Sequence, residues 1–200
     1  MGRPRKSDER APLSPDLIAD AALALVDREG LEALSMRRVG ATLGVEAMAL
    51  YHHFPNKEAL VEAVLQRGSP GSLPALTGNW RKDMKATMRV VYEQLSAHPS
   101  LLPLRWERRV NSPEAKLLVE QERQIFEAAG LTGSLALNVH RLLGSYVVGF
   151  VVAGISARKT IPESEWLPQF DVGLEILLEG VEVRRREARR SAGLPPRNSK

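Results

Sequence analysis

Two adjacent histidines, His52 and His53, are the residues of this sequence that first raise the question of metal or acid–base chemistry. Neighbouring side chains on a helix point about 100° apart, so the two rings suit one metal ion poorly. No Glu or Asp completes the H-E-x-x-H spacing of zinc proteases. No nucleophile–base pair, metal-ligand set or phosphate-binding loop is visible elsewhere. The sequence therefore predicts a protein that is not an enzyme and holds no cofactor or metal.

Arginines near the N-terminus are better suited to nucleic acid. Arg37 has the reach and the planar fork to read the O6 and N7 atoms of guanine, although a phosphate contact or a solvated side chain is as good an interpretation. Arg3 and Arg5 flank Pro4 in a polar arm that can lie extended in a minor groove. A merely solubilising arm is the alternative, and an adjacent DNA-binding motif favours the groove.

The stretch Ser35–Phe54 has the pattern of such a motif, a helix-turn-helix. Apolar residues spaced four apart predict a first short helix, and Gly44 can end it in a left-handed conformation. Gly40 is small where two such helices cross. A second helix is predicted to end at Phe54, before Pro55. A pair of this kind can place its second helix in a DNA major groove, and an ordinary helical hairpin in a core is the alternative.

The positive charge of the chain is not where DNA binding would require it. The net charge is +4, but residues 1–67 carry 9 basic and 10 acidic side chains, and residues 68–183 carry 12 and 13. Residues 184–200 carry 7 basic and 1 acidic side chain, so the excess lies in the tail. Any DNA contact therefore depends on where individual charges sit.

Helical patterns run through the whole sequence, and no segment alternates in the manner of a strand. Ser14, Ser35 and Asn56 each precede a helical pattern as a capping residue. Glycine, proline and serine gather in residues 68–78, which marks a domain boundary. The expected organisation is a flexible basic arm at 1–13, a helix-turn-helix domain at 14–67 with its motif at 35–54, a linker at 68–78, a helical domain at 79–188 and a basic flexible tail at 189–200.

The composition indicates in which cellular compartment the protein is expected. The sequence holds no cysteine, which excludes disulfides and zinc-thiolate sites and agrees with a cytoplasmic protein. No apolar segment of a secretory signal is visible near the N-terminus. The longest apolar run, near 142–155, contains Gly and Ser and falls short of the roughly 20 residues of a membrane span. A cytoplasmic protein without membrane contact is expected.

By residue 57 the series of motifs is specific enough to name a resemblance. The series comprises Ile18-Ala19-Asp20-Ala21-Ala22, Gly30, Ser35-Met36-Arg37-Arg38-Val39, Leu43-Gly44-Val45, Leu50-Tyr51-His52-His53-Phe54 and Asn56-Lys57-Glu58-Ala59-Leu60. In this order and spacing, residues 16–65 resemble the N-terminal domain of TetR-family transcriptional regulators, and in particular the tetracycline-repressor branch. Residues 79–182 resemble the C-terminal domain of that branch more loosely.

The resemblance implies an all-α fold: an N-terminal three-helix helix-turn-helix domain, then a C-terminal helical domain for ligand binding and dimerisation. The implied protein is a homodimer that binds a palindromic operator in double-stranded DNA and releases it when a small-molecule effector binds. Most members repress transcription and a few activate it. The implied DNA contacts are Arg37, the groove-facing Ala47, Met48 and Ala49, and the phosphate-facing Tyr51, His52 and Lys57, with His53 either at a phosphate or packed within the domain.

A ligand pocket in the second domain is a weaker expectation, because the same residues can form a solid core. Methionines suit an adaptable pocket, and a histidine or tyrosine can provide its polar group. The stretch LPLRWERR lacks the histidine that tetracycline-binding members use, so tetracycline–magnesium is not the expected ligand. The candidate lining residues are Trp80, Met84, Met88, Trp106, Phe126, His140, Tyr146 and Phe150.

The dimer is expected to form through the long helix near 146–157 and the last helix near 174–181. That last helix is expected to begin at Pro168. Burial within one subunit is the alternative. The candidate interface residues are Val148, Val152, Leu174, Leu177, Leu178 and Val181. An all-helical interaction module without sequence-specific DNA binding remains the alternative function.

Overall fold

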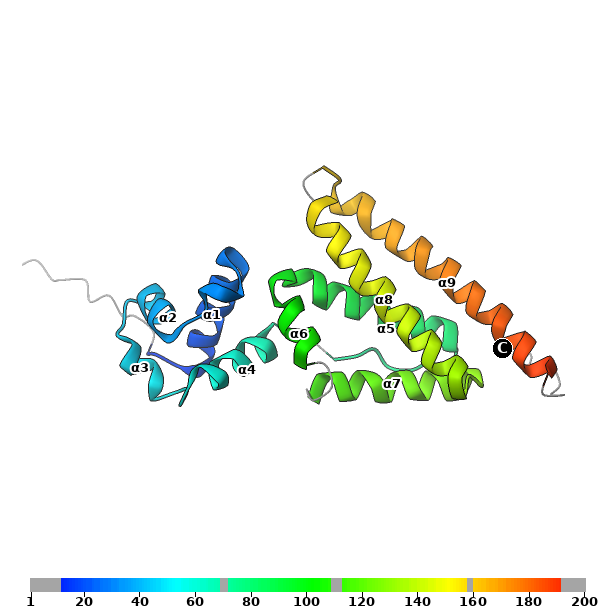
Figure 1. Ribbon diagram of the computed structural model, residues 1–200, viewed down its shortest axis with the longest axis horizontal. Helices are drawn as coiled ribbons and strands as arrows, with labels where there is room; N and C mark the ends of the chain where they lie inside the picture. The colour runs from blue at the N-terminus through cyan, green and yellow to red at the C-terminus, as the bar shows by residue number, and fades with distance from the viewer. Residues whose placement is uncertain (1–11, 69–71, 109–112, 158–159, 192–200) are drawn as a thin grey trace, which may run out of the picture. The chain divides into compact units, whose positions relative to one another are not determined.

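The computed structural model describes residues 12–68, 72–108, 113–157 and 160–191. Within these ranges every regular element is a helix, which confirms the predicted fold class (Figure 1). The chain divides into two compact units, residues 1–68 and 69–200. Arg3, Arg5 and the end of the tail lie outside the described residues.

Four α-helices and a short 3₁₀ turn at Leu31–Ala33 form the described part of the N-terminal unit. The residues that precede three of the α-helices explain where those helices start. Side-chain oxygens of Ser14, Ser35 and Asn56 accept hydrogen bonds from first-turn N–H groups at 3.2, 3.3 and 2.8 Å. Each bond satisfies a donor that the helix itself leaves free and stabilises the helix by about 1 kcal/mol. The helices are α1 (Pro15–Glu29), α2 (Met36–Leu43), α3 (Ala47–Tyr51) and α4 (Lys57–Arg67).

Two glycines set the tight turn between α2 and α3, as the sequence predicts. Gly44 ends α2 at φ 70°, in the left-handed region that favours glycine. A Cβ atom at Gly40 would lie 2.9 Å from the backbone oxygen of Val45, so only glycine lets the turn approach α2 this closely. The two short helices are therefore held against each other by backbone contact.

The second helix of the motif is shorter than predicted. It ends at Tyr51 rather than at Phe54. The chain then turns, with the Phe54 N–H donating to the Leu50 carbonyl at 2.9 Å, and the Phe54 side chain is buried. Pro55 disfavours a helical backbone at the residue before it, so the chain turns into the core there.

Five α-helices and a short 3₁₀ turn at Pro99–Leu101 form the described part of the C-terminal unit. The α-helices are α5 (Trp80–Ala97), α6 (Leu102–Arg108), α7 (Pro113–Ala129), α8 (Gly133–Ala157) and α9 (Glu163–Ser191). The last helix begins before Pro168, contrary to the prediction. The missing N–H of Pro168 frees only a carbonyl in the first turn, at Ser164, and both residues are exposed to water.

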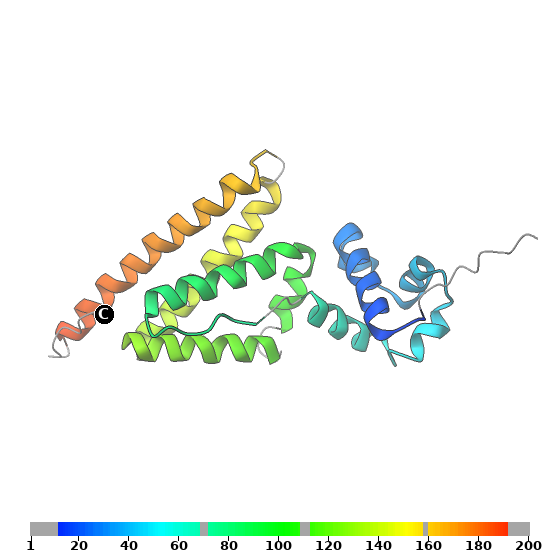
Figure 2. The same ribbon diagram turned by 180° about the vertical axis from the view of Figure 1, so that it is seen from behind.

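The second half of the predicted linker is fixed to the C-terminal unit, because polar side chains hold it between α5 and α7 (Figure 2). The buried carboxylate of Asp83 accepts hydrogen bonds from the backbone N–H groups of Thr77 and Gly78 at 2.8 and 3.0 Å. The Gln121 amide donates to the Pro74 carbonyl at 3.0 Å.

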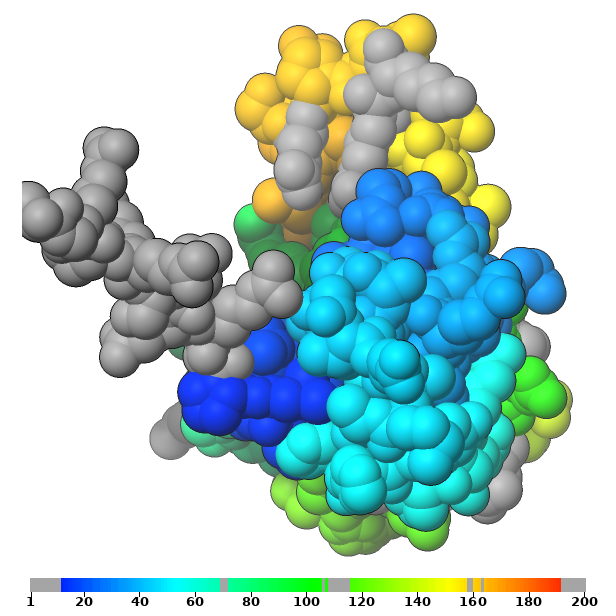
Figure 3. Space-filling model, turned by 90° about the vertical axis from the view of Figure 1, so that its left-hand side faces the viewer, coloured from blue at the N-terminus to red at the C-terminus, as the bar shows by residue number. Residues whose placement is uncertain are grey.

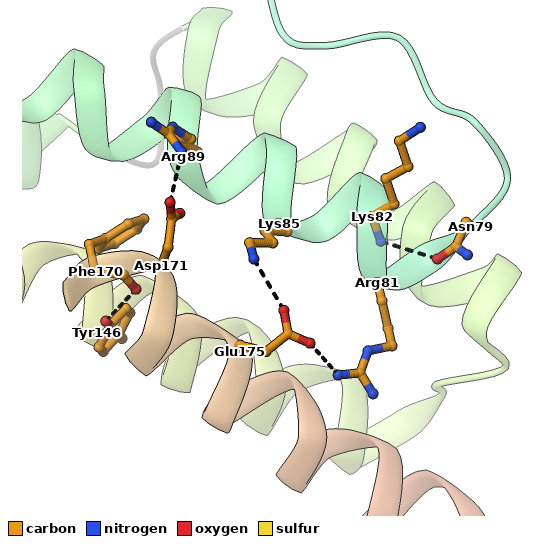
Figure 4. Close-up of polar contacts among 9 residues, drawn as sticks. All are labelled: Asn79, Arg81, Lys82, Lys85, Arg89, Tyr146, Phe170, Asp171 and Glu175. Carbon is orange, nitrogen blue, oxygen red and sulfur yellow. Dashed lines mark hydrogen bonds and ion pairs between the residues drawn. The ribbon is translucent and has the colours of Figure 1, made fainter. Parts of the chain in front are cut away.

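Aromatic rings from α5, α8 and α9 form one end of the C-terminal core. Tyr92 stacks on Phe170 at 4.4 Å between ring centroids, and Tyr146 stacks on the same ring at 5.3 Å. The Tyr146 hydroxyl donates to the Phe170 carbonyl at 2.8 Å (Figure 4). A Cβ atom at Gly173 would collide with that hydroxyl, so the helix needs glycine where it passes Tyr146.

A row of ion pairs joins α5 to α9 beside these rings (Figure 4). Arg81 and Lys85 both contact the Glu175 carboxylate, at 2.5 and 3.2 Å. Arg89 contacts Asp171 at 2.8 Å. Hydrogen bonds from Arg81, and then from Lys85, lower the pKa of Glu175 below its usual value. These pairs link three side chains of α5 to two of α9, beside the core packing of the two helices.

Candidate nucleic-acid interface

The described residues predicted to contact DNA lie on α2, on and just after α3, and at the start of α4. Helices α2 and α3 lie side by side on the face turned to the viewer in Figure 3. Exposed members of the predicted set are Arg37, Met48, Tyr51, His52 and Lys57, and half-buried members are Ala47, Ala49 and His53. The predicted residues are thus close in the sequence and accessible together.

The basic side chains of the N-terminal unit differ in whether acidic neighbours neutralise them. Arg28 and Arg38 pair with Glu29, and Arg67 pairs with Asp16 and Asp20. Hydrogen bonds from Arg28 and then Arg38 lower the pKa of Glu29.

Two of the unit's described basic residues differ from Arg28, Arg38 and Arg67 in having no acidic partner. Among the residues that the structure describes in this unit, Arg37 and Lys57 are the basic side chains without an ion pair. They stand in the first turns of α2 and α4, so they flank α3 in the sequence. The unit carries no overall positive charge, but its uncompensated cations lie at the candidate interface.

Helix α3, which lies between these two cations in the sequence, presents an apolar surface. Its inner side is anchored by Leu50, which is fully buried, whereas Met48 is 66% exposed. Residues 47–49 carry no hydrogen-bonding side chain. In a major groove they can offer only apolar contact, such as to thymine methyl groups.

Glu46 is a residue of this face that the sequence reasoning missed. It is the N-cap residue of α3, but its side chain makes no capping hydrogen bond and is exposed. A carboxylate here can accept a hydrogen bond from the amino group of cytosine, and it repels phosphate. The sequence feature that could have revealed Glu46 is its position as an acidic residue directly before a helix without charged side chains.

The backbone of α4 offers a further contact. Asn56 caps the helix by accepting from the Ala59 N–H, and the first-turn N–H groups of this 11-residue helix point toward its N-terminal end. The N-terminal end of a helix attracts anions through these donors and through its dipole. With Lys57 in the first turn, this end is suited to a phosphate.

The predicted pocket residues lie mostly in the core of the C-terminal unit. Tyr146 and Phe150 are partly buried against that core, and the side chain of Trp106 lies outside the described part. His140 contacts the buried carboxylate of Glu122 through Nδ1 at 2.6 Å, which joins α8 to α7. The core members of the predicted set are Trp80, Met84, Met88 and Phe126.

The structure corrects half of the predicted dimer interface. Leu174, Leu178 and Val181 are buried within their own subunit, at 0, 0 and 4% exposure, so they have no surface left to bury against another chain. Val152 is 53% exposed, and Val148 and Leu177 are half-buried.

The exposed apolar residues of α9 are Val172, Ile176 and Val183, at 61, 63 and 54%. The sequence reasoning missed them because it assigned the strongest apolar stripe to the interface. That stripe faces the subunit's own core. A second apolar stripe on the outward side of α9, formed by Val172, Ile176 and Val183, would have indicated the exposed surface.

Helix α8 is long and apolar enough, by length and composition, to cross a membrane, and only 22% of its most apolar window is buried within the chain. This differs from the expectation that no segment reaches the length of a span. Composition alone does not separate a membrane span from a helix covered by protein.

Comparison with known proteins supports the interpretation of the α2–α3 face as a nucleic-acid interface. Residues 18–64 match the family described as bacterial regulatory proteins, tetR family, and residues 73–169 match the tetracyclin repressor-like C-terminal domain. The HTH-type transcriptional repressor DrrR1 of Streptomyces coeruleorubidus is 34% identical over 74% of this chain and 56% of its own length. An HTH-type transcriptional regulator of Saccharopolyspora erythraea is 31% identical over 93% of this chain and 76% of its own. This chain thus spans little more than half the length of DrrR1.

Solved structures agree. BioQ, crystallised with its double-stranded DNA operator, superposes with a TM-score of 0.62 at 28% identity, over 86% of this chain and 99% of that one. ActR of Streptomyces coelicolor, in complex with actinorhodin, superposes with a TM-score of 0.63 at 25% identity, over 86% and 96%. The fold and the exposed α2–α3 face define a helix-turn-helix protein with a helical C-terminal domain. The chain belongs to the tetR family of bacterial regulatory proteins.

Proposed function

We propose that this protein is a homodimeric repressor that binds a palindromic operator and leaves it when a small molecule occupies the C-terminal unit. The observation that carries the proposal is the α2–α3 face, where Arg37 stands uncompensated beside an exposed apolar helix. DrrR1 is a transcriptional repressor, which favours repression over activation.

On the operator, α3 lies in the major groove and the flanking residues hold it there. Arg37 reads guanine through its planar fork. Tyr51, His52 and Lys57 contact phosphates or sugars, and they set the register without carrying sequence information. The half-buried His53 packs within the domain. The arm with Arg3 and Arg5 follows the adjacent minor groove.

The dimer forms through the outer faces of α8 and α9, and Val148, Val152 and Leu177 remain in the proposed interface. Exposed apolar side chains on the C-terminal part of α8 and on α9 need a cover: Val152, Ile155, Val172, Ile176 and Val183. Gly149 and Gly180 have open space where a side chain would stand, so a partner helix can approach closely. Two helices from each chain then form a four-helix bundle around a two-fold axis.

This interface accounts for the apolar character of α8 without a membrane. The outward residues of α8 are covered by the partner chain, so the helix is that of a water-soluble dimer. We accordingly place the protein in the cytoplasm, where its DNA is.

The effector binds among the predicted pocket residues of the C-terminal unit. ActR holds actinorhodin in its crystal structure, and the C-terminal region of this chain superposes within the same alignment. Glu122 and His140 are the polar groups between α7 and α8 that can orient a ligand. The aromatic side chains of Tyr146 and Phe150 supply apolar contact.

Selection of duplex fragments from a random pool, followed by footprinting, tests the proposal. A homodimer on a palindrome protects two inverted half-sites whose centres are about one helical turn, or a multiple of it, apart. Recovery of no common sequence would indicate the alternative, a helical interaction module without specific DNA binding. Protection of a single half-site would contradict the dimer.

A further inference from the structure

Met48 is the most exposed large apolar side chain in the part of the chain that the structure describes, at 66%. It is the second residue of α3, on the side opposite the buried Leu50. Its neighbours Ala47 and Ala49 are small and half-buried, so the thioether projects beyond them. Core packing therefore does not explain a methionine at this position.

The position of Met48 is fixed by backbone contact rather than by its own side chain. Gly40 allows the turn before α3 to approach α2 closely, and Leu50 is fully enclosed. A helix held in this way presents residue 48 in one place, while the unbranched thioether adapts to the surface that it meets.

The major groove offers few apolar targets. Base edges there present hydrogen-bond donors and acceptors, and the C5 methyl group of thymine is the one apolar group among the four natural bases. Met48 can neither donate a hydrogen bond nor replace a water bound to a base acceptor. Its favourable neighbour in the groove is therefore a thymine methyl.

We propose that Met48 reads the C5 methyl group of one thymine in each operator half-site. The inference rests on the proposed operator binding and adds to it a specificity-determining residue and a chemical class of base. Recognition at this position works by apolar contact, and the hydrogen bonds of the interface come from other residues, such as Arg37.

Replacement of thymine by uracil tests this contact, because it removes only the methyl group. In an operator selected from a random pool, each symmetric pair of thymines is replaced in turn by uracil. Loss of one buried methyl weakens binding about fourfold, the equivalent of about 0.8 kcal/mol. Loss in both half-sites weakens it about fifteenfold if the two contributions add. At the same position, 5-bromouracil, whose bromine fills a similar space, restores the affinity.

Met48→Ala identifies the protein partner of the methyl group. Because the side chain is exposed, the variant is expected to fold, and circular dichroism checks that it does. For Met48→Ala, the thymine and uracil operators bind equally at the sensitive position, whereas Met48→Leu keeps most of the difference. Leu117→Ala removes a similarly exposed apolar residue, 65% exposed on α7, and keeps the full difference.

The outcomes separate this inference from the proposed function. A specific operator that no uracil replacement weakens overturns the methyl contact and leaves operator binding intact. A uracil effect that persists in Met48→Ala assigns the methyl to another residue and also overturns the inference. If selection yields no specific operator, both the proposed function and the inference fail.

Discussion

Arg37 and Arg38 are neighbours on α2 with the same charge and different surroundings. Arg38 is held by Glu29, whereas Arg37 has no ion pair among the described residues of its unit. An arginine already held by a carboxylate must give up that contact to bind DNA, and a free one need not. The two side chains are chemically identical, so only their neighbours in the folded structure, which the sequence does not show, distinguish their roles.

Arg37→Ala is expected to weaken specific operator binding by about 1–3 kcal/mol and to relax one base preference. Arg38→Ala is the matched control and is expected to change the affinity less. Fluorescence titrations with the operator and with a random duplex provide the measurement. If Arg37→Ala weakens both duplexes equally, Arg37 is a phosphate contact and the guanine assignment is wrong.

Gly40→Ala tests the close approach of α2 to the turn before α3. The added Cβ, 2.9 Å from the Val45 oxygen, pushes against backbone rather than a flexible side chain. Overpacking of this kind costs about 1–3 kcal/mol in the free energy of unfolding. We expect lower stability in denaturant titration and weaker operator binding. Thr42→Ala, at an exposed position of the same helix, is the control for stability, and equal stability of the two variants would contradict the close approach.

At the scale of elements, the ion pairs between α5 and α9 give a pH-dependent contribution to stability. Glu175→Gln removes the charge that holds both Arg81 and Lys85. The groups are partly exposed, so we expect the free energy of unfolding to fall by only about 1 kcal/mol at neutral pH.

The direction of the pH effect follows from the lowered pKa of Glu175, whose usual value is 4.5. A carboxyl with a lower pKa in the folded state stabilises it above the unfolded pKa, and that contribution disappears as the pH falls through the folded pKa. The difference between wild type and Glu175→Gln should therefore shrink below pH 4.5. Denaturant titrations at neutral and acid pH measure it, and an unchanged difference would contradict the pairing.

The helix starts show which parts of the fold were predictable. Ser14, Ser35 and Asn56 cap helices through bonds that span three residues, so short sequence windows contain the whole cause. The start of α9 was not predictable in this way. Proline usually marks a first turn, yet here the helix begins five residues earlier, at Glu163, because an exposed carbonyl can be satisfied by water.

The two candidate sites also differ in how far short sequence windows determine them. Most of the residues predicted to contact DNA fall within one short motif, so local sequence patterns were enough to find them. The dimer face depends on which of two apolar stripes on α9 meets the subunit's own core. Leu174 and Ile176 are equally apolar, and only the packing of α9 against its neighbours buries one and exposes the other.

At the scale of the whole molecule, the exposed stripe on α9 predicts the oligomeric state. Ile176→Glu places a charge in the proposed interface, where burial without a partner is costly. We expect monomers in sedimentation velocity and loss of operator binding, because one half-site alone binds weakly. Ile176 is a cleaner test than Leu177, which is half-buried against its own subunit.

The control is Leu117→Glu, a change of the same kind at a 65% exposed residue on α7. It should leave the dimer intact. If Ile176→Glu also sediments as an unchanged dimer, the association surface lies elsewhere on the molecule.

Sequence-specific DNA binding by the intact chain is the central claim, and one titration tests it most directly. The selected operator and a scrambled duplex of the same length are titrated with protein at two salt concentrations. A specific regulator prefers the operator by at least about a thousandfold, and both affinities fall steeply with salt as phosphate contacts release counterions. Equal affinity for the two duplexes, or affinity that salt does not change, would contradict the assignment of α2 and α3 as a DNA-reading surface.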